Sequence, residues 1–439
     1  MKPFPADFLW GTSQSGHKIE GQNFNSDWWR WEQRPGRIAD GSISKEAADH
    51  AGRFEQDFAL AQYLGHNAHL FSLEWARIQP SPGEFDEEAL EHYHSVFEAL
   101  RVRRLEPICA LQHVTVPRWF ADRYGWHSNA APDLFQVYAE RVAREFGPHC
   151  RRWIPIREPM HWCTMAYLER AWPPASRLLN LARARRALVN MANAHARAYR
   201  ALHEASTDAL VGTAVHARLF TALDPESAWD VRTARREQRR CNHIWLNALT
   251  TGRWPLQLGR AEEIKDTLDF IGVAYYGSET VRFSLLRPGK IFAQRTEPEG
   301  QPQKRLRYTA DPEGFCSVLR EMARYRRPIL ITANGLATDD DERRCRYLVE
   351  HIGALRKALD GGVDVRGYCF SSLLDGFEWD AGYTERFGLV HVNRKLLTRT
   401  PNPSALLYKE LCETGTIRPG TIAKYCPERN ESTQGIAVS

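Results

Sequence analysis

Short apolar stretches rich in β-branched residues alternate along the whole chain with longer stretches that carry apolar residues at helical spacing. The short stretches have the length and composition of buried strands, and the long ones follow the 3.6-residue period of amphipathic helices. Clear helical patterns occupy Asp133–Phe146, Leu188–Ala205 and Asp341–Leu359. The predicted strands are Phe8–Gln14, Asn67–Leu73, Glu106–His113, Trp153–Glu158, Ala209–Ala217, Phe270–Gly277, Ile329–Ala333 and Val365–Leu373.

Eight strands that alternate with helices predict an α/β fold, a (β/α)8 TIM barrel that forms a single domain. A doubly wound open sheet is the alternative, but the chain has neither a G-x-G-x-x-G motif nor a P-loop to support it. We expect the barrel to span residues 1–426, with Ser284–Leu306 as a long exposed loop after the sixth strand. The tail, residues 427–439, is polar, and we expect it to be disordered.

Composition narrows the class of function. The net charge of +5 comes with basic clusters at Arg183–Arg186 and Arg235–Arg240, whose spacing indicates solvated helix faces. They lack the aromatic interleaving or zinc spacing of a nucleic-acid module, so we expect no nucleic-acid partner. No apolar run approaches the length of a membrane span, and no secretory signal pattern opens the chain. Nine scattered cysteines without a C-x-x-C pair favour a reducing compartment, so the expected location is cytoplasmic.

Catalytic residues of such a barrel lie at the C-terminal ends of its strands. The predicted strand ends carry imidazole, carboxylate, phenol, indole and cationic groups, which together suit the hydroxyls and the apolar faces of a sugar. These residues are His17, Lys18, His113, Arg157, Glu158, Tyr275, Tyr276, Glu378 and Trp379. The seventh strand, in the segment PILITANG, ends differently, because Ala333 places a methyl group where a catalytic side chain is expected.

Eight segments of the chain, in this order, resemble glycoside hydrolase family 1, the retaining β-glucosidase family. They are FLWGTSQSGHKIEG (Phe8–Gly21), SDWWRWE (Ser26–Glu32), FSLEWARIQP (Phe71–Pro80), LQHVTVPRWF (Leu111–Phe120), REP (Arg157–Pro159), DFIGVAYY (Asp269–Tyr276), LITANG (Leu330–Gly335) and SLLDGFEWDAGYTERFGLV (Ser372–Val390). The resemblance runs from about Phe4 to Glu413. It implies a TIM barrel that acts on a small-molecule glycoside, and we expect neither a metal nor another cofactor. The oligomeric state stays open.

The resemblance also assigns roles to individual residues. Members of the family use two glutamates, an acid/base and a nucleophile. The acid/base matches Glu158, whereas the nucleophile of the family's T-E-N-G pattern falls on Ala333. Tyr276 keeps the position that contacts the nucleophile, and three residues keep positions that contact sugar hydroxyls. These three are His113, Glu378 and Trp379.

Further departures from the family pattern surround the same sugar-binding position. The family's Gln, Asn, Asn, Trp and Arg are replaced here by Lys18, Arg157, Ala274, Ser371 and Leu70 in that order. The lost arginine normally pairs with the nucleophile carboxylate. Because a buried arginine without its carboxylate is costly, joint loss of both partners favours natural divergence over an engineered Ala333. The engineered substitution remains the alternative.

The charges of the predicted site have changed with these substitutions. Without the nucleophile's negative charge, and with Arg157 next in sequence, Glu158 is expected to be ionised at neutral pH. Strand alternation would turn Arg157 away from Glu158, so the sequence leaves their contact open. The added cations Lys18 and Arg157 favour an anionic ligand. The alternative, that Lys18 simply pairs with Glu378 or Glu158, is about equally supported.

Three functions follow from this pattern. The favoured one is an enzyme that acts on a glycoside or a sugar-like ligand without a covalent intermediate, with Glu158 as general acid or base. The second is a retaining β-glycosidase that carries an engineered substitution at Ala333. The third is a sugar-binding protein that keeps the pocket and has lost the chemistry. We favour an enzyme because Glu158, His113 and Tyr276 all persist.

Overall fold

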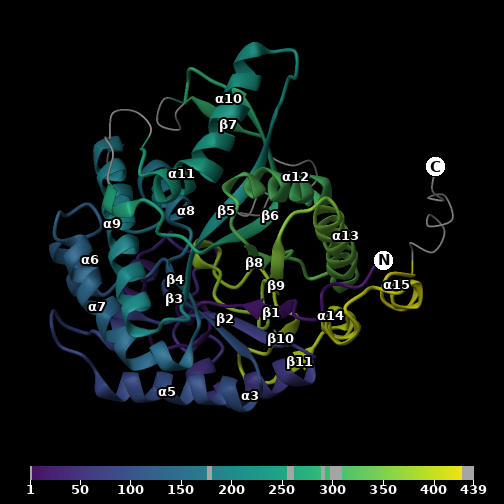
Figure 1. Ribbon diagram of the computed structural model, residues 1–439, viewed down its shortest axis with the longest axis horizontal. Coiled ribbons are helices and arrows are strands. Elements are labelled where there is room, and N and C mark those ends of the chain that lie inside the picture. Colours follow the sequence, from purple (N-terminus) through teal and green to yellow (C-terminus); the bar gives the residue numbers. More distant parts are fainter. Residues whose placement is uncertain (1, 176–179, 255–261, 288–291, 297–308, 428–439) are drawn as a thin grey trace.

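Parallel strands close into a barrel at the centre of the computed structural model (Figure 1). Their order around the ring is β5-β4-β3-β2-β1-β9-β8-β6, and pairing of β5 with β6 closes it. The strands are β1 (Leu9–Ser13), β2 (Ala68–Ser72), β3 (Glu106–Gln112), β4 (Arg152–Ile156), β5 (Leu210–Ala222), β6 (Phe270–Phe283), β8 (Ile329–Asn334) and β9 (Val365–Phe370). The structure describes residues 2–175, 180–254, 262–287, 292–296 and 309–427. The closed ring of eight parallel strands confirms the predicted TIM barrel in one domain and rules out the open sheet.

Helices surround the barrel and connect its strands (Figure 1). The longer ones are α3 (His50–Tyr63), α5 (Glu87–Val102), α7 (Ala131–Phe146), α9 (Leu181–Ala205), α10 (Ala228–Gln238), α12 (Pro312–Met322), α13 (Asp341–Asp360) and α14 (Pro403–Thr414). The shorter ones are α1 (Gly16–Ile19), α2 (Asp27–Glu32), α4 (Trp75–Ile78), α6 (Arg118–Arg123), α8 (Pro159–Cys163), α11 (Ile244–Thr251) and α15 (Pro419–Tyr425). Local sequence sets several starts: the side chains of Asp86 and Asp340 accept the amides of Ala89 and Arg343 and so cap α5 and α13.

Each predicted strand is present, but β5 and β6 extend several residues further than predicted. After a register shift between Ala217 and Leu219, β5 and β6 stay paired beyond the ring and reach Ala222 and Phe283. A further strand, β7 (Ala293–Arg295), pairs antiparallel with β6. The prediction of a long exposed loop over Ser284–Leu306 is therefore wrong at β7, and residues 288–291 and 297–306 of that range lie outside the described residues. Together with α10, these strands form a unit that projects from the barrel (Figure 1), which we call the β5–β6 extension.

Apolar side chains fill the barrel interior below its C-terminal rim. Residues of seven strands meet in one buried cluster: Ala68, Leu70, Ile108, Ala110, Ile154, Ala214, Phe270, Leu330 and Cys369. Side chains from so many strands of a ring can converge only inside it. A second, larger cluster joins the outer face of the strands to the helices. The open end of the barrel above Leu70 therefore remains for a site.

The two ends of the described chain lie on one side of the barrel (Figure 1). The amide of Phe4 donates to the carbonyl of Gly415 at 2.8 Å, which ties the first residues to the end of α14. The predicted tail lies outside the described residues except for Pro427.

All nine cysteines are free thiols. Among the described helices, none combines the length and the apolar character needed to cross a membrane.

Candidate active site

A cavity of about 890 Å³ opens at the C-terminal ends of the barrel strands, and we call it the central cavity. It collects most of the residues predicted for the site. Lys18, His113, Arg157, Glu158, Tyr276, Ser371, Glu378 and Trp379 all line it. Further residues also line it: Arg218, Glu279, Arg282 and Arg295 of the β5–β6 extension, Arg287 after β6, Glu169 and Trp172 after α8, and Asp380 next to Trp379.

Glu158 reaches the cavity because the backbone turns sharply after β4. Arg157 still forms a bridge with Ala214 of β5, whereas Glu158 adopts a left-handed conformation (φ 55°, ψ 44°) at the start of α8. This conformation ends strand alternation, so both side chains face the site. The Nε atom of Arg157 lies 3.4 Å from Oε1 of Glu158. The contact that the sequence left open is therefore present.

Histidines surround the Glu158 carboxylate. The Nδ1 atom of His216 lies 3.1 Å from Oε2, and Nε2 of His113 lies 3.9 Å from Oε1. Burial above all holds the pKa of both imidazoles well below the ordinary value, so they are neutral at pH 7. Burial would also raise the pKa of Glu158, but the surrounding positive charge, Arg157 foremost, outweighs it and lowers that pKa. An ionised Glu158, as expected from the sequence, follows.

Potential metal-ligand atoms of Glu158, His161 and His216 lie within 4.8 Å of one another. Two imidazoles and a carboxylate are chemically suited to a divalent cation. However, Nη2 of Arg218 lies 2.9 Å from Nδ1 of His161, and Arg157 lies beside Glu158. A metal ion would meet two guanidinium charges there. We therefore interpret the three residues as a hydrogen-bonded network around the carboxylate.

Lys18 and Glu378 form an ion pair on another wall of the cavity. Lys18 follows β1 in α1, and its Nζ atom lies 2.6 Å from Oε1 of Glu378, which follows β9. Of the two partners considered for Lys18, Glu378 is the one it contacts. Burial raises the pKa of Glu378, and the charge of Lys18 opposes that rise. The adjacent Trp379 packs against His17, with ring centroids 5.8 Å apart, and against His113 at 5.6 Å.

The end of β8 is irregular where Ala333 lies. Val273 pairs with Ile331, but the next pair is Ala274 with Ala333, so Thr332 is an extra residue on β8. Such a bulge redirects side chains and is common beside active sites. Ala333 is fully buried, and Gly335 lets the chain pass close to β9, since a Cβ there would lie 2.0 Å from the Ser371 carbonyl oxygen. Across the cavity rim, the hydroxyl groups of Tyr276 and Ser371 lie 3.3 Å apart.

Residues 1–416 match the model of the family described as glycosyl hydrolase family 1. The chain belongs to this family. Beta-glucosidase A of Thermotoga maritima is 29% identical over 95% of this chain and 99% of its own length. A beta-galactosidase of Pyrococcus woesei is 28% identical over 93% and 96%. The solved beta-glycosidase of Pyrococcus horikoshii superposes with a TM-score of 0.89 at 32% identity, covering 97% of this chain and 98% of that one. The Thermotoga maritima beta-glucosidase in complex with deoxynojirimycin gives 0.89 at 28% identity, with 95% and 100% covered.

Sequence reasoning missed several residues of this family 1 site. His216 ends the ring portion of β5, two positions after Ala214 of the barrel interior, so strand alternation could have identified it. His161 lies three residues after Glu158 at the start of α8, where helical spacing brings it to the same side. Arg218 and Glu279 lie on the extension whose length was not predicted, and nothing in their local sequence marks them.

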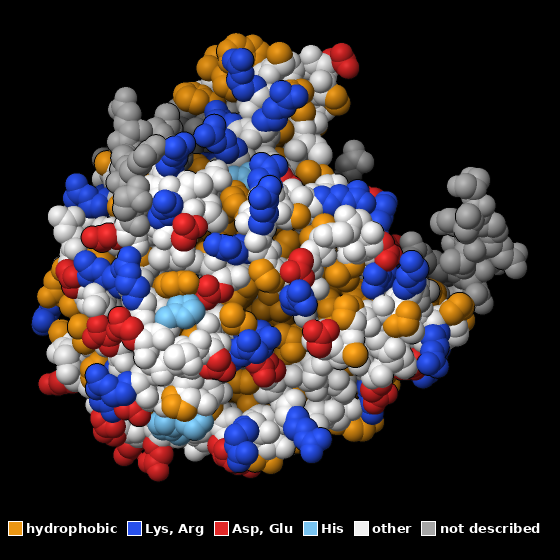
Figure 2. All heavy atoms as spheres, in the orientation of Figure 1, with side chains coloured by type: hydrophobic (Ala, Val, Ile, Leu, Met, Phe, Trp, Pro, Cys, Tyr) orange, Lys and Arg blue, Asp and Glu red, His pale blue; other side chains and the backbone are white. Residues whose placement is uncertain are grey.

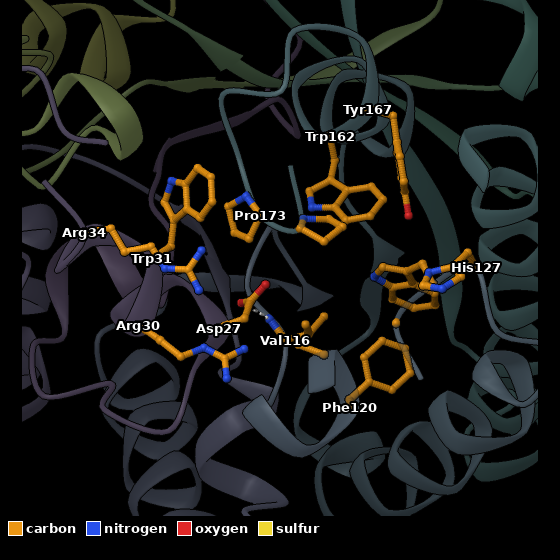
Figure 3. A pocket seen from close by; sticks show the side chains of 14 residues that line it. Asp27, Arg30, Trp31, Arg34, Val116, Phe120, His127, Trp162, Tyr167 and Pro173 are labelled. Atoms are coloured by element: carbon orange, nitrogen blue, oxygen red, sulfur yellow. Dashed lines mark hydrogen bonds between the residues drawn. The ribbon is translucent and has the colours of Figure 1, made fainter. Parts of the chain in front are cut away.

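A second, smaller cavity lies between α2, α6 and the segment after α8 (Figure 3). Its volume is about 130 Å³, and Trp31, Phe120, Trp162 and Tyr167 contribute aromatic walls. Asp27 is buried there, and one carboxylate oxygen accepts the amide of Val116 at 3.0 Å. None of the residues predicted for the site lines it. The central cavity is therefore the candidate active site of this family member.

Proposed function

We propose that this family 1 protein is an enzyme that acts on a glycoside or a sugar-like ligand with an anionic group, without a covalent glycosyl-enzyme intermediate. Glu158 is the general acid or base, and Ala333 stands at the position of the family's nucleophile. Lys18, His113, Arg157, Ser371, Glu378 and Trp379 contact the ligand, and Tyr276 lies beside the reacting carbon. The observation that carries this proposal is an ionised Glu158 held among Arg157, His216 and His113.

The surroundings of Ala333 support natural divergence. A bulge lies at Thr332 of β8, yet the next side chain is a methyl group. Leu70, where the family carries an arginine, is fully buried in the apolar cluster of the barrel interior. A carboxylate at position 333 would find no arginine at position 70 and would instead lie near Arg157, whose Nη2 is 3.5 Å from the Thr332 carbonyl oxygen. These changes fit one another, as expected for a site that works without the carboxylate.

The proposed class of ligand is supported by the molecules bound in solved relatives and by the positive charge of the central cavity. The Thermotoga maritima beta-glucosidase has been solved with deoxynojirimycin and with castanospermine, which are sugar-like molecules. Hydroxyl-contacting groups at the corresponding rim, His113, Glu378 and Trp379, are present here and line the cavity. Lys18 and Arg157 add positive charge, which favours an anionic group on the ligand.

Restoring the glutamate tests the proposal. We expect Ala333→Glu alone to leave hydrolysis of an aryl β-glucoside within about tenfold of the unmodified chain, because Arg157 would pair with the new carboxylate and hold it from the anomeric carbon. Adding Leu70→Arg and Arg157→Asn restores the family's pairing, so the triple variant should exceed the single variant by at least about a hundredfold. Strong hydrolysis by Ala333→Glu alone would instead identify a conventional retaining enzyme that merely lacks its nucleophile.

The binding-protein alternative makes a different prediction for Glu158. Glu158→Gln keeps the size of the side chain and its contact with His216 but cannot exchange a proton. If the protein only binds its ligand, this variant should retain its biological function. Loss of function at unchanged ligand affinity, measured by calorimetry, is the result expected for an enzyme.

A further inference from the structure

The small cavity between α2, α6 and the segment after α8 contains a buried carboxylate that no cationic side chain neutralises. Asp27 is 7% exposed, and Figure 3 shows its carboxylate in the middle of the lining side chains. The amide of Val116 donates to Oδ1 at 3.0 Å, and no lysine, arginine or histidine of the described residues forms an ion pair with Asp27. Burying a charge without a partner is costly, and groups perturbed in this way cluster at functional sites. Asp27 therefore offers its negative charge to a ligand.

Aromatic rings line the cavity around this carboxylate. Phe120, Trp162 and Tyr167 lie across it from Arg30 and Arg34 (Figure 3). The face of an aromatic ring attracts a cation, and rings grouped around a cavity are how proteins recognise ammonium groups that carry alkyl substituents. A divalent metal ion would need several oxygen or nitrogen ligands, whereas the described lining residues supply one carboxylate. The walls therefore suit an organic cation better than a metal ion.

The basic side chains that line the cavity do not take the place of such a ligand. Arg30 is held by Asp122, with Nη1 2.9 Å from Oδ2. Arg34 is exposed, and water screens exposed charges, which carry both signs over the barrel surface (Figure 2). Burial lowers the pKa of His127, so this imidazole is neutral at pH 7. Among the described lining residues, Asp27 is therefore the buried ionisable group that still lacks a counter-charge.

The size of the cavity limits the ligand to a small group. Its volume of about 130 Å³ approaches the roughly 150 Å³ of a cavity that holds benzene in another protein. A nitrogen atom with three methyl groups fits such a space. The central cavity shares none of its described lining residues with this one. However, Trp172 lines the central cavity and the next residue, Pro173, lines the small one, so the two sites lie on either side of one segment.

We propose that the small cavity binds a small organic cation, an alkylated ammonium group, with its nitrogen beside Asp27 and its methyl groups against Phe120, Trp162 and Tyr167. The carboxylate supplies the counter-charge, and the ring faces replace the water that the cation loses on binding. No covalent bond forms or breaks. This site goes beyond the proposed function, because it uses none of the residues assigned to the glycoside.

Three probes of similar shape and different charge test the inference on the full, unmodified chain. Choline is the cation, neohexyl alcohol carries a carbon atom in place of the choline nitrogen and is neutral, and tert-butylacetate is the anion. Binding is measured by calorimetry at pH 8, where Asp27 is mostly ionised, because burial raises its pKa to about 7. We expect choline to bind at least about tenfold more tightly than neohexyl alcohol. Equal affinities for these two probes, or tightest binding of the anion, would overturn the inference.

Two substitutions locate the bound cation. Asp27→Asn keeps the size of the side chain and removes its charge. It should weaken choline binding at least about tenfold and change the affinity for neohexyl alcohol less than about threefold. The matched control is Glu378→Gln, which removes a buried carboxylate of the central cavity and should leave choline binding unchanged. Equal loss in the two variants, or no loss in Asp27→Asn, would overturn the inference.

The ring of Trp162 gives a separate readout. Trp162→Leu keeps an apolar wall and removes the ring face, so it should weaken choline binding by about threefold or more and the binding of neohexyl alcohol less. Thermal unfolding shows that each variant is folded before affinities are compared. Equal weakening of both probes would overturn the assigned contact between the cation and the ring. None of these measurements involves Ala333, so the proposed function stands or falls by its own experiment.

Discussion

Asp27 is the residue whose ionisation should most visibly oppose folding. Burial raises its pKa to about 7, and the amide hydrogen bond from Val116 only partly compensates. The pKa of an Asp carboxyl in an unfolded chain is about 4, so the folded state binds the proton more tightly. The ionised form therefore destabilises the fold above pH 7, and this penalty disappears as the pH falls from about 7 to about 4.

Replacing Asp27 with Asn removes the ionisation and keeps an oxygen for Val116. We expect Asp27→Asn to stabilise the protein by about 1–3 kcal/mol at pH 8, seen as a higher Tm, with a smaller gain at pH 5 that vanishes near pH 4. Asp122→Asn, which breaks the exposed pair with Arg30, is the control and should lower the Tm slightly at both pH values. A gain for Asp27→Asn that is larger at pH 5 than at pH 8 would contradict the assignment.

At this scale the resemblance to family 1 selected residues most of which line one cavity, but the sequence could not supply the contacts between them. Lys18, His113 and Glu378 follow strands, so the barrel alone brings them to one rim. The Arg157–Glu158 contact depends on the left-handed backbone conformation of Glu158. No residue type in this segment indicates that conformation. Whether Lys18 pairs with Glu378 or Glu158 depends on side-chain directions across the ring, which strand ends do not determine.

Among the elements, the β5–β6 extension depends on a buried carboxylate shared by two arginines. Glu279 of β6 lies 2.8 Å from Nη1 of Arg218 on β5 and 2.8 Å from Nε of Arg295 on β7, and its side chain is 5% exposed. Because these three residues link three strands beyond the barrel ring, the carboxylate balances the charges that hold the extension together. Removing one partner of a buried ion pair leaves an uncompensated charge.

We expect Glu279→Gln to destabilise the protein by about 2–4 kcal/mol and to increase hydrogen exchange in the outer parts of β5 and β6 while the ring strands stay protected. The matched control is Glu98→Gln, which breaks an exposed pair with Arg101 on α5 and should change stability far less. Equal losses in the two variants, or exchange that spreads evenly over the barrel, would show that Glu279 does not hold the extension.

The predicted strand starts were most accurate where the sequence contains a buried apolar run. Ring strands such as β3 and β9 begin at the predicted residue because they are buried apolar runs. Strand prediction failed beyond the ring, where polar residues such as Arg218, Glu279 and Arg282 interrupt the apolar pattern of β5 and β6. These strands are held by each other and by α10, so their length depends on tertiary contacts that a local pattern does not contain.

For the whole molecule, closure of the barrel brings together residues from opposite ends of the chain. Asp57 of α3 and Arg399 of β11 (Arg399–Pro401) are 342 positions apart, and the guanidinium meets the carboxylate at 2.8 and 3.0 Å. Asp57 is fully buried, and its other neighbour is His50 at 2.8 Å. Burial alone would raise the pKa of Asp57, but His50 and Arg399 hold it below the usual value. Stability from this contact is therefore present above about pH 4 and is lost as the pH falls further.

Removing the carboxylate alone should be worse than removing the pair. We expect Asp57→Ala to destabilise the protein by about 3–5 kcal/mol, because Arg399 would remain buried, at 3% side-chain exposure, without its counter-charge. The double variant Asp57→Leu, Arg399→Met replaces the pair with apolar groups and should recover more than half of that loss. Thermal unfolding of the single variants Asp57→Leu and Arg399→Met and of the double variant forms the cycle that measures the coupling. Additive losses would mean that the two residues stabilise the fold independently, and the contact between the first βα unit and the end of the chain would then carry no energy of its own.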